Sequence, residues 1–254
     1  MAATIYHDSV GTYDASITTL NDGGGSGEFI DSDSLTNEER AIDEDITQVI
    51  SGWANSEGLQ FDFSSAVTLD FCAIYSTVAE SNQVRVYRDN AASGTFGNSN
   101  ILSSVALGWN IQHLSSGGAG GSYQYRSVWA NTGELTGIAE IFFGVAIEIA
   151  PTANIITQHK FGSEEIKAFG ANRFYISKHD NYKILTVSLD HISSSTKTSL
   201  ETFSNNVTNR KPFIYSEDGT TGPFHYVRLV RPLTFRQVTP DIFSCQVVMR
   251  ELTS

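Results

Sequence analysis

Short runs in which hydrophobic and polar residues alternate fill most of the chain between Trp53 and Ile149. A period of two places successive side chains on opposite faces of a β-strand. The runs are separated by stretches rich in Ser, Asn, Glu and Gly, which are typical of turns. They occupy residues 58–65, 67–76, 82–89, 106–114, 123–131 and 138–149. Strands this short and this closely spaced predict an antiparallel jelly-roll β-sandwich over residues 53–150.

The chain after Pro151 has a different pattern. Strand-like runs rich in aromatic residues lie on both sides of one segment with a helical period. In that segment, between Ser193 and Asn209, hydrophobic residues are spaced at i, i+3 and i+7, and Ser or Thr is available as the N-cap. They are Leu200, Phe203 and Val207. We therefore expect residues 151–254 to form a smaller α+β domain with an antiparallel sheet or barrel and one helix.

Residues 1–52 are predicted to form an acidic N-terminal arm followed by a short helix. The arm mixes short apolar pieces with Gly, Asp and Ser. Thr36 and Glu39 have the spacing of a capping box. The residues that follow at helical spacing are Ile42, Ile46, Val49 and Ile50. This pattern predicts a helix over about residues 37–50.

Charge is distributed unevenly along the chain. Residues 1–150 contain 19 acidic and 4 basic side chains, a net charge of −15, whereas residues 151–254 contain 9 acidic and 12 basic ones, a net charge of +3. This division predicts two units with different surfaces. Nucleic-acid binding needs clustered Lys and Arg, so the acidic part argues against it. The N-terminus has no secretory pattern, and Glu140 and Glu148 interrupt the most apolar stretch, so we expect no membrane insertion.

The sequence offers no pattern typical of catalysis or of a resident cofactor. It contains no G-x-S-x-G motif, and Asp190 and His191 are consecutive strand residues that point to opposite faces. Cys72 and Cys245 lie in apolar runs and are predicted to be small buried hydrophobic residues, with a disulfide between them as the alternative. The six His do not have metal-ligand spacing. A structural calcium ion in a sandwich loop remains an alternative that the sequence cannot place. We predict that the chain is not an enzyme.

Two groups of side chains are candidates for binding. Four aromatic residues flank a Gly-rich loop at 117–121, where exposed rings could stack on sugar rings; the alternative is that they belong to the core and rim of the sandwich. They are Trp109, Tyr123, Tyr125 and Trp129. The second group, Arg228, Arg231 and Arg236, is a candidate for subunit docking. Because Arg231 differs in strand parity from the other two, a single basic stripe is not expected unless Pro232 shifts the register.

The sandwich segment resembles the galactose-binding-like, or discoidin-type, jelly roll over about residues 53–148. An early strand pair carries hydrophobic-D-hydrophobic-A-I, and later strands carry Y-R-hydrophobic and I-A-E-I. The matching residues are Leu69, Asp70, Phe71, Ala73, Ile74, Tyr125, Arg126, Val128, Ile138, Ala139, Glu140 and Ile141. The resemblance implies a β-sandwich. The disulfide that usually closes the termini in the extracellular family has no counterpart here, and the sugar-binding loops of that family have no fixed pattern to transfer.

The segment at about residues 140–254 resembles small tail-tip, hub, adaptor or baseplate proteins of tailed bacteriophages. In those proteins a helix ends in an (R/K)PF-(I/V)-Y strand, and the last strand ends in hydrophobic-x-hydrophobic-x-E. The matching residues are Pro212, Phe213, Ile214, Tyr215, Val247, Met249 and Glu251. The resemblance implies a structural virion subunit that is made in the host cytoplasm, assembles into a homo-oligomeric ring and contacts other tail proteins. The alternative function is a carbohydrate-binding module that adsorbs to host-surface polysaccharide.

Overall fold

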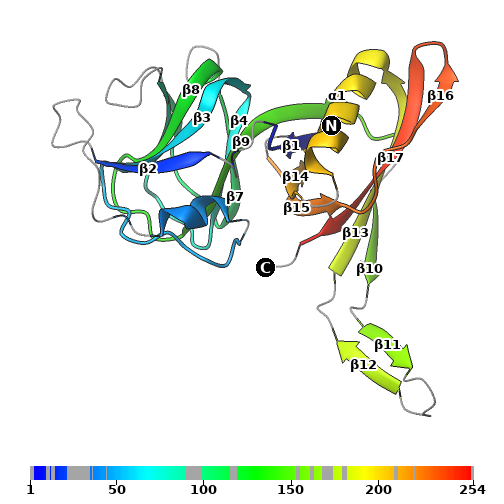
Figure 1. Cartoon of the computed structure of the whole chain (residues 1–254), viewed down its shortest axis with the longest axis horizontal. Helices are drawn as coiled ribbons and strands as arrows, with labels where there is room; N and C mark the ends of the chain where they lie inside the picture. Colours follow the sequence, from blue (N-terminus) through cyan, green and yellow to red (C-terminus); the bar gives the residue numbers. More distant parts are fainter. Residues whose placement is uncertain are drawn as a thin grey trace. The chain divides into compact units, whose positions relative to one another are not determined.

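The computed structural model describes most of the chain, which forms two compact units (Figure 1). The sandwich unit is Tyr6–Ala146, and the C-terminal unit combines Met1–Ile5 with Ile147–Ser254. These boundaries differ from the boundaries predicted from the sequence, which lie at residues 52 and 150. The described residues are 3–9, 12, 15–21, 35, 37–43, 45–89, 99–114, 119–152, 155–160, 163–167, 174–178, 182–208, 211–219 and 221–252.

The sandwich unit consists of two antiparallel sheets. One has the strand order β2-β3-β8-β5-β6, and the other has the order β9-β4-β7 within this unit. The strands are β2 (Ser16–Asn21), β3 (Glu57–Leu69), β4 (Phe71–Ser76), β5 (Val84–Asp89), β6 (Ser99–Leu102), β7 (Gly108–His113), β8 (Gly121–Ala130) and β9 (Ile138–Ile149). This arrangement confirms the predicted antiparallel β-sandwich.

The hydrophobic core of the sandwich unit lies between the two sheets. Alternate residues of each strand face inward, as the period of two requires. From one sheet come Leu59, Phe61, Val84, Val86 and Val128, and from the other come Cys72, Ile74, Ile141 and Phe143. The rings of Phe61 and Phe143 meet edge to face at 5.2 Å between centroids, which joins the two layers directly.

The predicted helix over residues 37–50 is wrong. The structure has only a short 3-10 helix, η2 (Glu38–Ile42), and Asn37 before it has a left-handed backbone conformation with no side-chain cap. Thr36 of the expected capping box lies outside the described residues. Beyond η2, the Asp43 carboxylate accepts a hydrogen bond from the backbone N–H of Asp45, and Asp45 does the same for Thr47. These local bonds compete with the helical ladder and end the helix early.

The C-terminal unit combines one antiparallel sheet with one α-helix. The sheet has the order β10-β13-β17-β15-β14-β1, and β16 also pairs with β17. A separate hairpin is formed by β11 and β12. The elements are β1 (Ala3–His7), β10 (Ile156–Lys160), β11 (Ser163–Lys167), β12 (Phe174–Lys178), β13 (Tyr182–Ser193), α1 (Ser194–Val207), β14 (Phe213–Ser216), β15 (Phe224–Leu229), β16 (Phe235–Thr239) and β17 (Ile242–Glu251).

Helix α1 covers one face of this sheet. Its Leu200, Phe203 and Val207 are fully buried, which confirms the predicted helix and its apolar face. The Ser193 side chain caps the helix by accepting a hydrogen bond from the backbone N–H of Thr196. Cys245 joins this second core on β17. Both cysteines are buried and free, as predicted without a disulfide, and burial raises the pKa of each thiol.

The described residues lack two features, a metal-binding cluster and a membrane-spanning helix. No group of three or more His, Cys, Asp or Glu side chains that could hold a metal ion occurs among them. Within the same residues, no helix has the length and hydrophobicity needed to cross a membrane.

His7 on β1 makes the stability of the sandwich unit depend on pH. Its side chain is 3% exposed, and burial lowers its pKa from 6.5 to about 4. The unfolded chain therefore takes up a proton at a higher pH than the folded chain does, and stability falls as the pH drops from 6.5 towards 4. We expect the free energy of unfolding to be about 2 kcal/mol lower at pH 5 than at pH 7.

Tryptophan fluorescence during urea unfolding measures this effect, because all three tryptophans belong to the sandwich unit. The matched variant is His7→Gln, which cannot titrate in this range. We expect the variant to lose most of the dependence between pH 7 and pH 5. Equal slopes for both proteins would show that His7 does not control the acid sensitivity.

Candidate functional site

A cleft of about 300 Å³ opens on the sandwich unit between residues 49–54 and residues 134–136. The two segments are far apart in sequence, and an isolated antiparallel bridge between Trp53 and Leu135 joins them. Trp53 is 2% exposed, and its Nε1–H donates to the backbone carbonyl of Glu57 at 2.8 Å. The indole is therefore fixed and buried beneath the cleft, and it offers no free face to a ligand. We call this site the loop cleft.

Hydrogen bonds hold both walls of the loop cleft in place. The Glu80 carboxylate accepts from the backbone N–H groups of Thr136 and Gly137, at 2.6 and 2.9 Å. On the opposite wall, the Arg40 guanidinium donates to the backbone carbonyl of Val49 at 3.0 Å. Because these partners fix the backbone, the shape of the cleft is set before a ligand arrives.

The rim of the loop cleft carries polar side chains. Ser51, Glu134 and Thr136 line it and are exposed. They supply two hydroxyl groups, which donate and accept, and one carboxylate, which accepts when ionised. A concave site of this size with a few exposed polar groups on its rim is suited to a small molecule.

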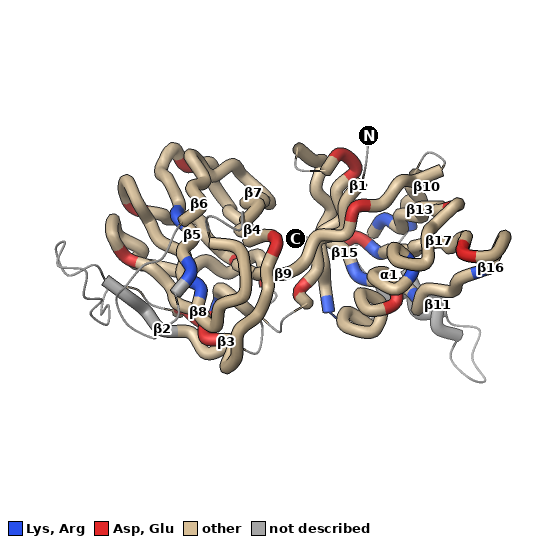
Figure 2. Tube along the Cα trace, turned by 90° about the horizontal axis from the view of Figure 1, so that it is seen from above, with Lys and Arg blue, Asp and Glu red and all other residues tan. Residues whose placement is uncertain are grey.

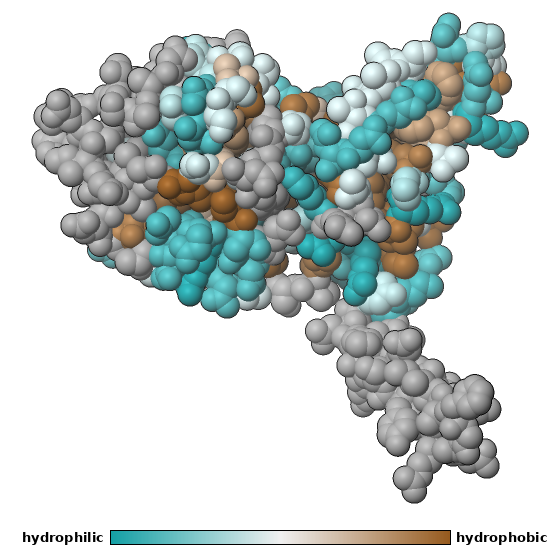
Figure 3. Space-filling view, viewed as in Figure 1, coloured by the Kyte–Doolittle hydropathy of each residue, from teal (hydrophilic) through white to brown (hydrophobic). Residues whose placement is uncertain are grey.

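Two of the four aromatic residues predicted to bind sugar are buried. Trp109, on β7, is 8% exposed and makes edge-to-face contacts with Tyr75 and Phe142. Trp129, on β8, is 4% exposed, and its ring lies so close to Gly58 that a Cβ there would come within 2.6 Å. Neither ring offers a free face for stacking, so for these two residues the structure agrees with the alternative, a position in the core of the sandwich. On the view in Figure 3, the hydrophobic surface of the described residues is broken into separate patches.

The other two, Tyr123 and Tyr125, lie on β8 and are partly exposed. The Arg88 guanidinium covers the Tyr123 ring at 4.4 Å from its centroid. The Tyr125 hydroxyl accepts from the Gln124 amide at 3.0 Å, and the same amide donates to Asp62 at 2.8 Å. These contacts engage both tyrosines with neighbouring side chains. The structure does not bring the four aromatic residues together as one site.

The three arginines predicted to dock a subunit lie in the C-terminal unit. Arg231 and Arg236 line a second cleft of about 500 Å³, and Arg228 lies on β15 opposite Arg250 of β17. The expected separation of Arg231 from the other two by strand parity does not occur, because Arg231 follows the end of β15 and is not bound by its alternation. Their role in subunit docking stays a prediction.

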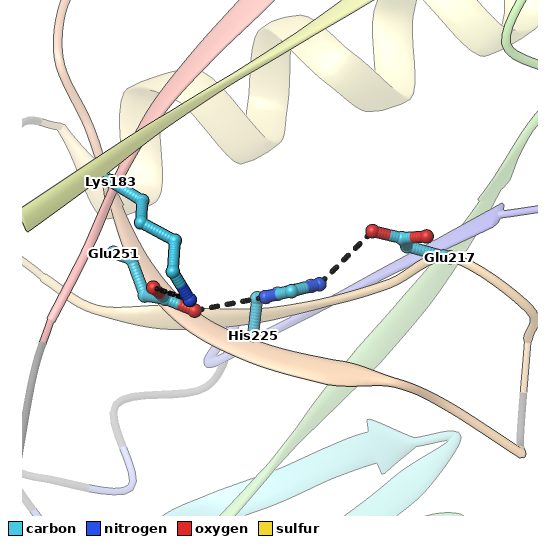
Figure 4. A network of polar contacts seen from close by, with 4 residues as sticks. All are labelled: Lys183, Glu217, His225 and Glu251. Atoms are coloured by element: carbon cyan, nitrogen blue, oxygen red, sulfur yellow. Dashed lines mark hydrogen bonds and ion pairs between the residues drawn. The ribbon is translucent and has the colours of Figure 1, made fainter. Parts of the chain in front are cut away.

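A polar network lies on the α1 side of the sheet in the C-terminal unit (Figure 4). The Lys183 ammonium contacts Glu251 at 2.9 Å, Glu251 contacts His225 Nδ1 at 3.0 Å, and His225 Nε2 contacts Glu217 at 3.1 Å. Both His225 contacts can be hydrogen bonds to ionised carboxylates only when the ring is doubly protonated.

The electrostatics of this network favour a structural role. Burial raises the pKa of Glu251, but the hydrogen bonds from His225 and Lys183 outweigh it, so the net pKa is lowered. The neighbouring Tyr215 ring stacks on His225, and burial together with Glu217 raises the Tyr215 pKa to about 12. The four members form a continuous chain of contacts, in which each side chain has at least one partner. We therefore interpret the network as the polar border of the core beside α1.

Sequence reasoning did not identify the loop cleft. In the sequence, Trp53 stands out only as the residue where the alternating pattern begins, and Glu134 belongs to no pattern. The two walls meet because Trp53 and Leu135 form a bridge between distant loops, and no local pattern encodes that pairing. The one available signal was that Glu134 lies in a short polar loop segment between two strand-like runs, where binding residues are often found.

No protein-family model matches the sequence, and no curated protein matches it. Several solved structures are similar to part of the chain. One is chitosan-binding module 2 of a chitosanase/glucanase from Paenibacillus sp. IK-5, in complex with chitotriose: 10% identity, 53% of this chain, 98% of that chain and a TM-score of 0.36. A fucose-binding module of Streptococcus pneumoniae has 15% identity, covering 55% and 95% of the two chains, with a TM-score of 0.39.

A third similar structure is the family 32 carbohydrate-binding module of C. perfringens NanJ in complex with galactose. It shares 13% identity with this chain, and the match covers 56% of this chain and 98% of the module, with a TM-score of 0.38. Over about half of its length, the chain is therefore similar in structure to carbohydrate-binding modules.

Proposed function

We propose that the sandwich unit binds a neutral or amino sugar in the loop cleft. The observation that carries the proposal is the cleft itself: about 300 Å³, with the exposed Glu134 on its rim. A pyranose ring has apolar C–H faces and several hydroxyl groups. Its hydroxyl groups match the hydroxyls of Ser51 and Thr136 and the Glu134 carboxylate, which are exposed on the rim.

The charge on the rim narrows the class of sugar. The Glu134 carboxylate can accept hydrogen bonds from sugar hydroxyls or from a protonated amine, and charge-assisted bonds are the stronger kind. It would repel the carboxylate of an acidic sugar, and the sandwich unit belongs to the strongly acidic part of the chain. Galactose, fucose and chitotriose, which appear with the similar modules, are all neutral or amino sugars and serve as probes.

Binding is expected to depend on Glu134 and on an open cleft. Glu134→Gln keeps the size of the side chain but removes its charge, and we expect it to weaken binding about tenfold for an amino sugar. Ser51→Trp places a large ring on the exposed rim, and we expect it to abolish binding by filling the cleft. Calorimetric titration with galactose, fucose and chitotriose measures both effects.

The matched control is Glu39→Gln, which neutralises an exposed carboxylate of the same unit that does not line the cleft. It should bind like the unchanged chain. Trp109→Ala and Trp129→Ala are poor probes, since both rings are buried and their removal would destabilise the unit. If Glu134→Gln and Ser51→Trp both retain full affinity for every sugar that the chain binds, the loop cleft is not the site.

Assembly in a phage tail stays a prediction. It rests on the resemblance of the C-terminal segment, and so do the virion location, the homo-oligomeric ring and the contacts with other tail proteins. The proposal involves no catalytic step. Sugar binding by the sandwich unit is compatible with a place in a phage tail and with a separate binding module, because adsorption to host-surface polysaccharide needs only the cleft. Mass measurement at high protein concentration tests the ring, and a strict monomer would contradict it.

A further inference from the structure

The second cleft, in the C-terminal unit, is lined by positively charged side chains, whereas the loop cleft has a carboxylate on its rim. Its volume is about 500 Å³, and its lining includes Arg231, Arg236, Asp190 and Gln246. Neither arginine takes part in an ion pair among the described residues; Arg231 donates only a long hydrogen bond, 3.4 Å, to the Gln246 amide oxygen. Two exposed guanidinium groups without a carboxylate partner are available to an anion.

The cleft lies on the sheet face opposite α1. Helix α1 packs on the face that carries Leu185, Val187 and Val247. Ser188 of β13 is paired with Gln246 of β17, and these two residues alternate with the buried ones, so they point away from the helix. Arg236 is paired with Ser244 and shares their face. The cleft is therefore built on strands and separated from the core.

More arginines follow the cleft along the same face. Arg250 of β17 lies opposite Arg228 of β15, and both have the same parity as Gln246. The Arg250 guanidinium is held over the Tyr182 ring, at 4.0 Å from its centroid. We call Arg228, Arg231, Arg236 and Arg250 the arginine row. From Ser244 to Arg250 it extends about 20 Å along β17, and Figure 2 shows basic positions on these strands.

The arginine row combines cationic groups with acceptors for hydroxyl groups. Asp190 accepts from the Thr152 hydroxyl through one carboxylate oxygen, at 2.9 Å, and no contact of the described residues engages the other oxygen. Asp190, the Gln246 amide and the hydroxyls of Ser188 and Ser244 can bind sugar hydroxyls beside the guanidinium groups. A nucleic acid is less suitable, because none of the described residues that line the cleft has an aromatic ring for base stacking.

We propose that the arginine row binds an acidic polysaccharide, with one uronate carboxylate held between Arg231 and Arg236 in the cleft. The neighbouring uronate residues of the ligand would lie towards Arg228 and Arg250. A polysaccharide can follow the arginine row over its length of about 20 Å. The site belongs to the C-terminal unit and does not depend on the proposed function of the loop cleft.

The test is titration of the full chain with trigalacturonate, at low salt and at about 0.3 M NaCl, where screening is strong. We expect binding that is at least tenfold weaker for Arg231→Gln/Arg236→Gln, weaker at high salt, and at least tenfold weaker for an uncharged galactose trimer. The control variant is Arg85→Gln/Lys197→Gln, which removes two positive charges outside the row. It should bind trigalacturonate like the unchanged chain.

Four results would overturn the proposal. They are no binding of trigalacturonate, equal binding by the double arginine variant, equal loss in the control variant, or tighter binding of an oligothymidylate with three phosphates. Ser51→Trp separates the two sites: it closes the loop cleft and should leave uronate binding unchanged. If Ser51→Trp removes uronate binding, the acidic sugar enters the loop cleft and the arginine row is not its site.

Discussion

Replacing Gly144 with alanine is expected to destabilise the sandwich unit by about 3 kcal/mol or more. Gly144 is buried on β9, and a Cβ at this position would overlap the backbone carbonyl of His7 on β1. It would also lie 3.1 Å from a ring carbon of Phe71. The obstacle is backbone and not the end of a flexible side chain, so a change of rotamer cannot relieve it. One of the two strands must move.

Urea unfolding followed by tryptophan fluorescence measures the loss, since every tryptophan lies in the sandwich unit. Gly108→Ala is the control. Gly108 has a φ of +91°, which disfavours alanine, but no atom lies within 4 Å of the added Cβ. We expect it to lower the free energy of unfolding by only about 1 kcal/mol. Similar losses in both variants would show that backbone conformation, and not the close approach of β1, explains why glycine occupies position 144.

The strands of the sandwich were predictable because their hydrophobic period is two and one face of each is buried. The runs at 67–76 and 138–149 contain β4 and β9, and the core residues alternate as expected. Helix α1 was predictable for the same reason, at its own period. In both cases the local sequence is enough to predict the element, because an element with one buried face has hydrophobic residues at its own period.

Other elements depended on contacts that local sequence does not contain. Strand β6 lies in the segment 91–104, which has no strand pattern; it exists because residues Ser99–Leu102 pair with β5 at the edge of the sheet. The pattern after Thr36 has helical spacing, yet Asp43 and Asp45 bind the nearby backbone and the helix stops at Ile42. Tertiary pairing decided the first case, and side-chain competition with the backbone decided the second.

The candidate sites show the same limit. Alternation identifies which face of a strand is polar, but not whether a ring on that face is covered. Trp129 has the parity of the outer face of its sheet and is nevertheless 4% exposed, because its ring lies on Gly58. For the arginines, parity separated Arg231 from Arg228 only on the assumption of one continuous strand. β15 ends at Leu229, so Arg231 is free to join the same face.

Arg126 is expected to be the most sensitive charged residue in the sandwich unit. It continues the inward-facing series of Val128 and Ala130 on β8, and its side chain is completely buried. Its two terminal nitrogens donate to four backbone carbonyls, at distances of 2.9 to 3.4 Å; the acceptors are Val67, Gly121, Tyr123 and Tyr125. Burial, with a smaller contribution from Arg88, lowers the Arg126 pKa to about 10.

One of these bonds, to the Val67 carbonyl, joins β8 to β3 where their register shifts between Asp62 and Val67, and the other three have acceptors on β8 itself. Arg126→Met keeps much of the side-chain volume but leaves the four carbonyls without this donor, and we expect a loss of about 4 kcal/mol in the free energy of unfolding. Arg88→Met is the matched control. It removes the hydrogen bond to the Gly120 carbonyl, at 3.3 Å, and the contact with the Tyr123 ring from a partly exposed arginine opposite Arg126, and should lower stability by about 1 kcal/mol. If the two variants unfold at the same urea concentration, the guanidinium of Arg126 does not hold the register shift, and its burial serves packing alone.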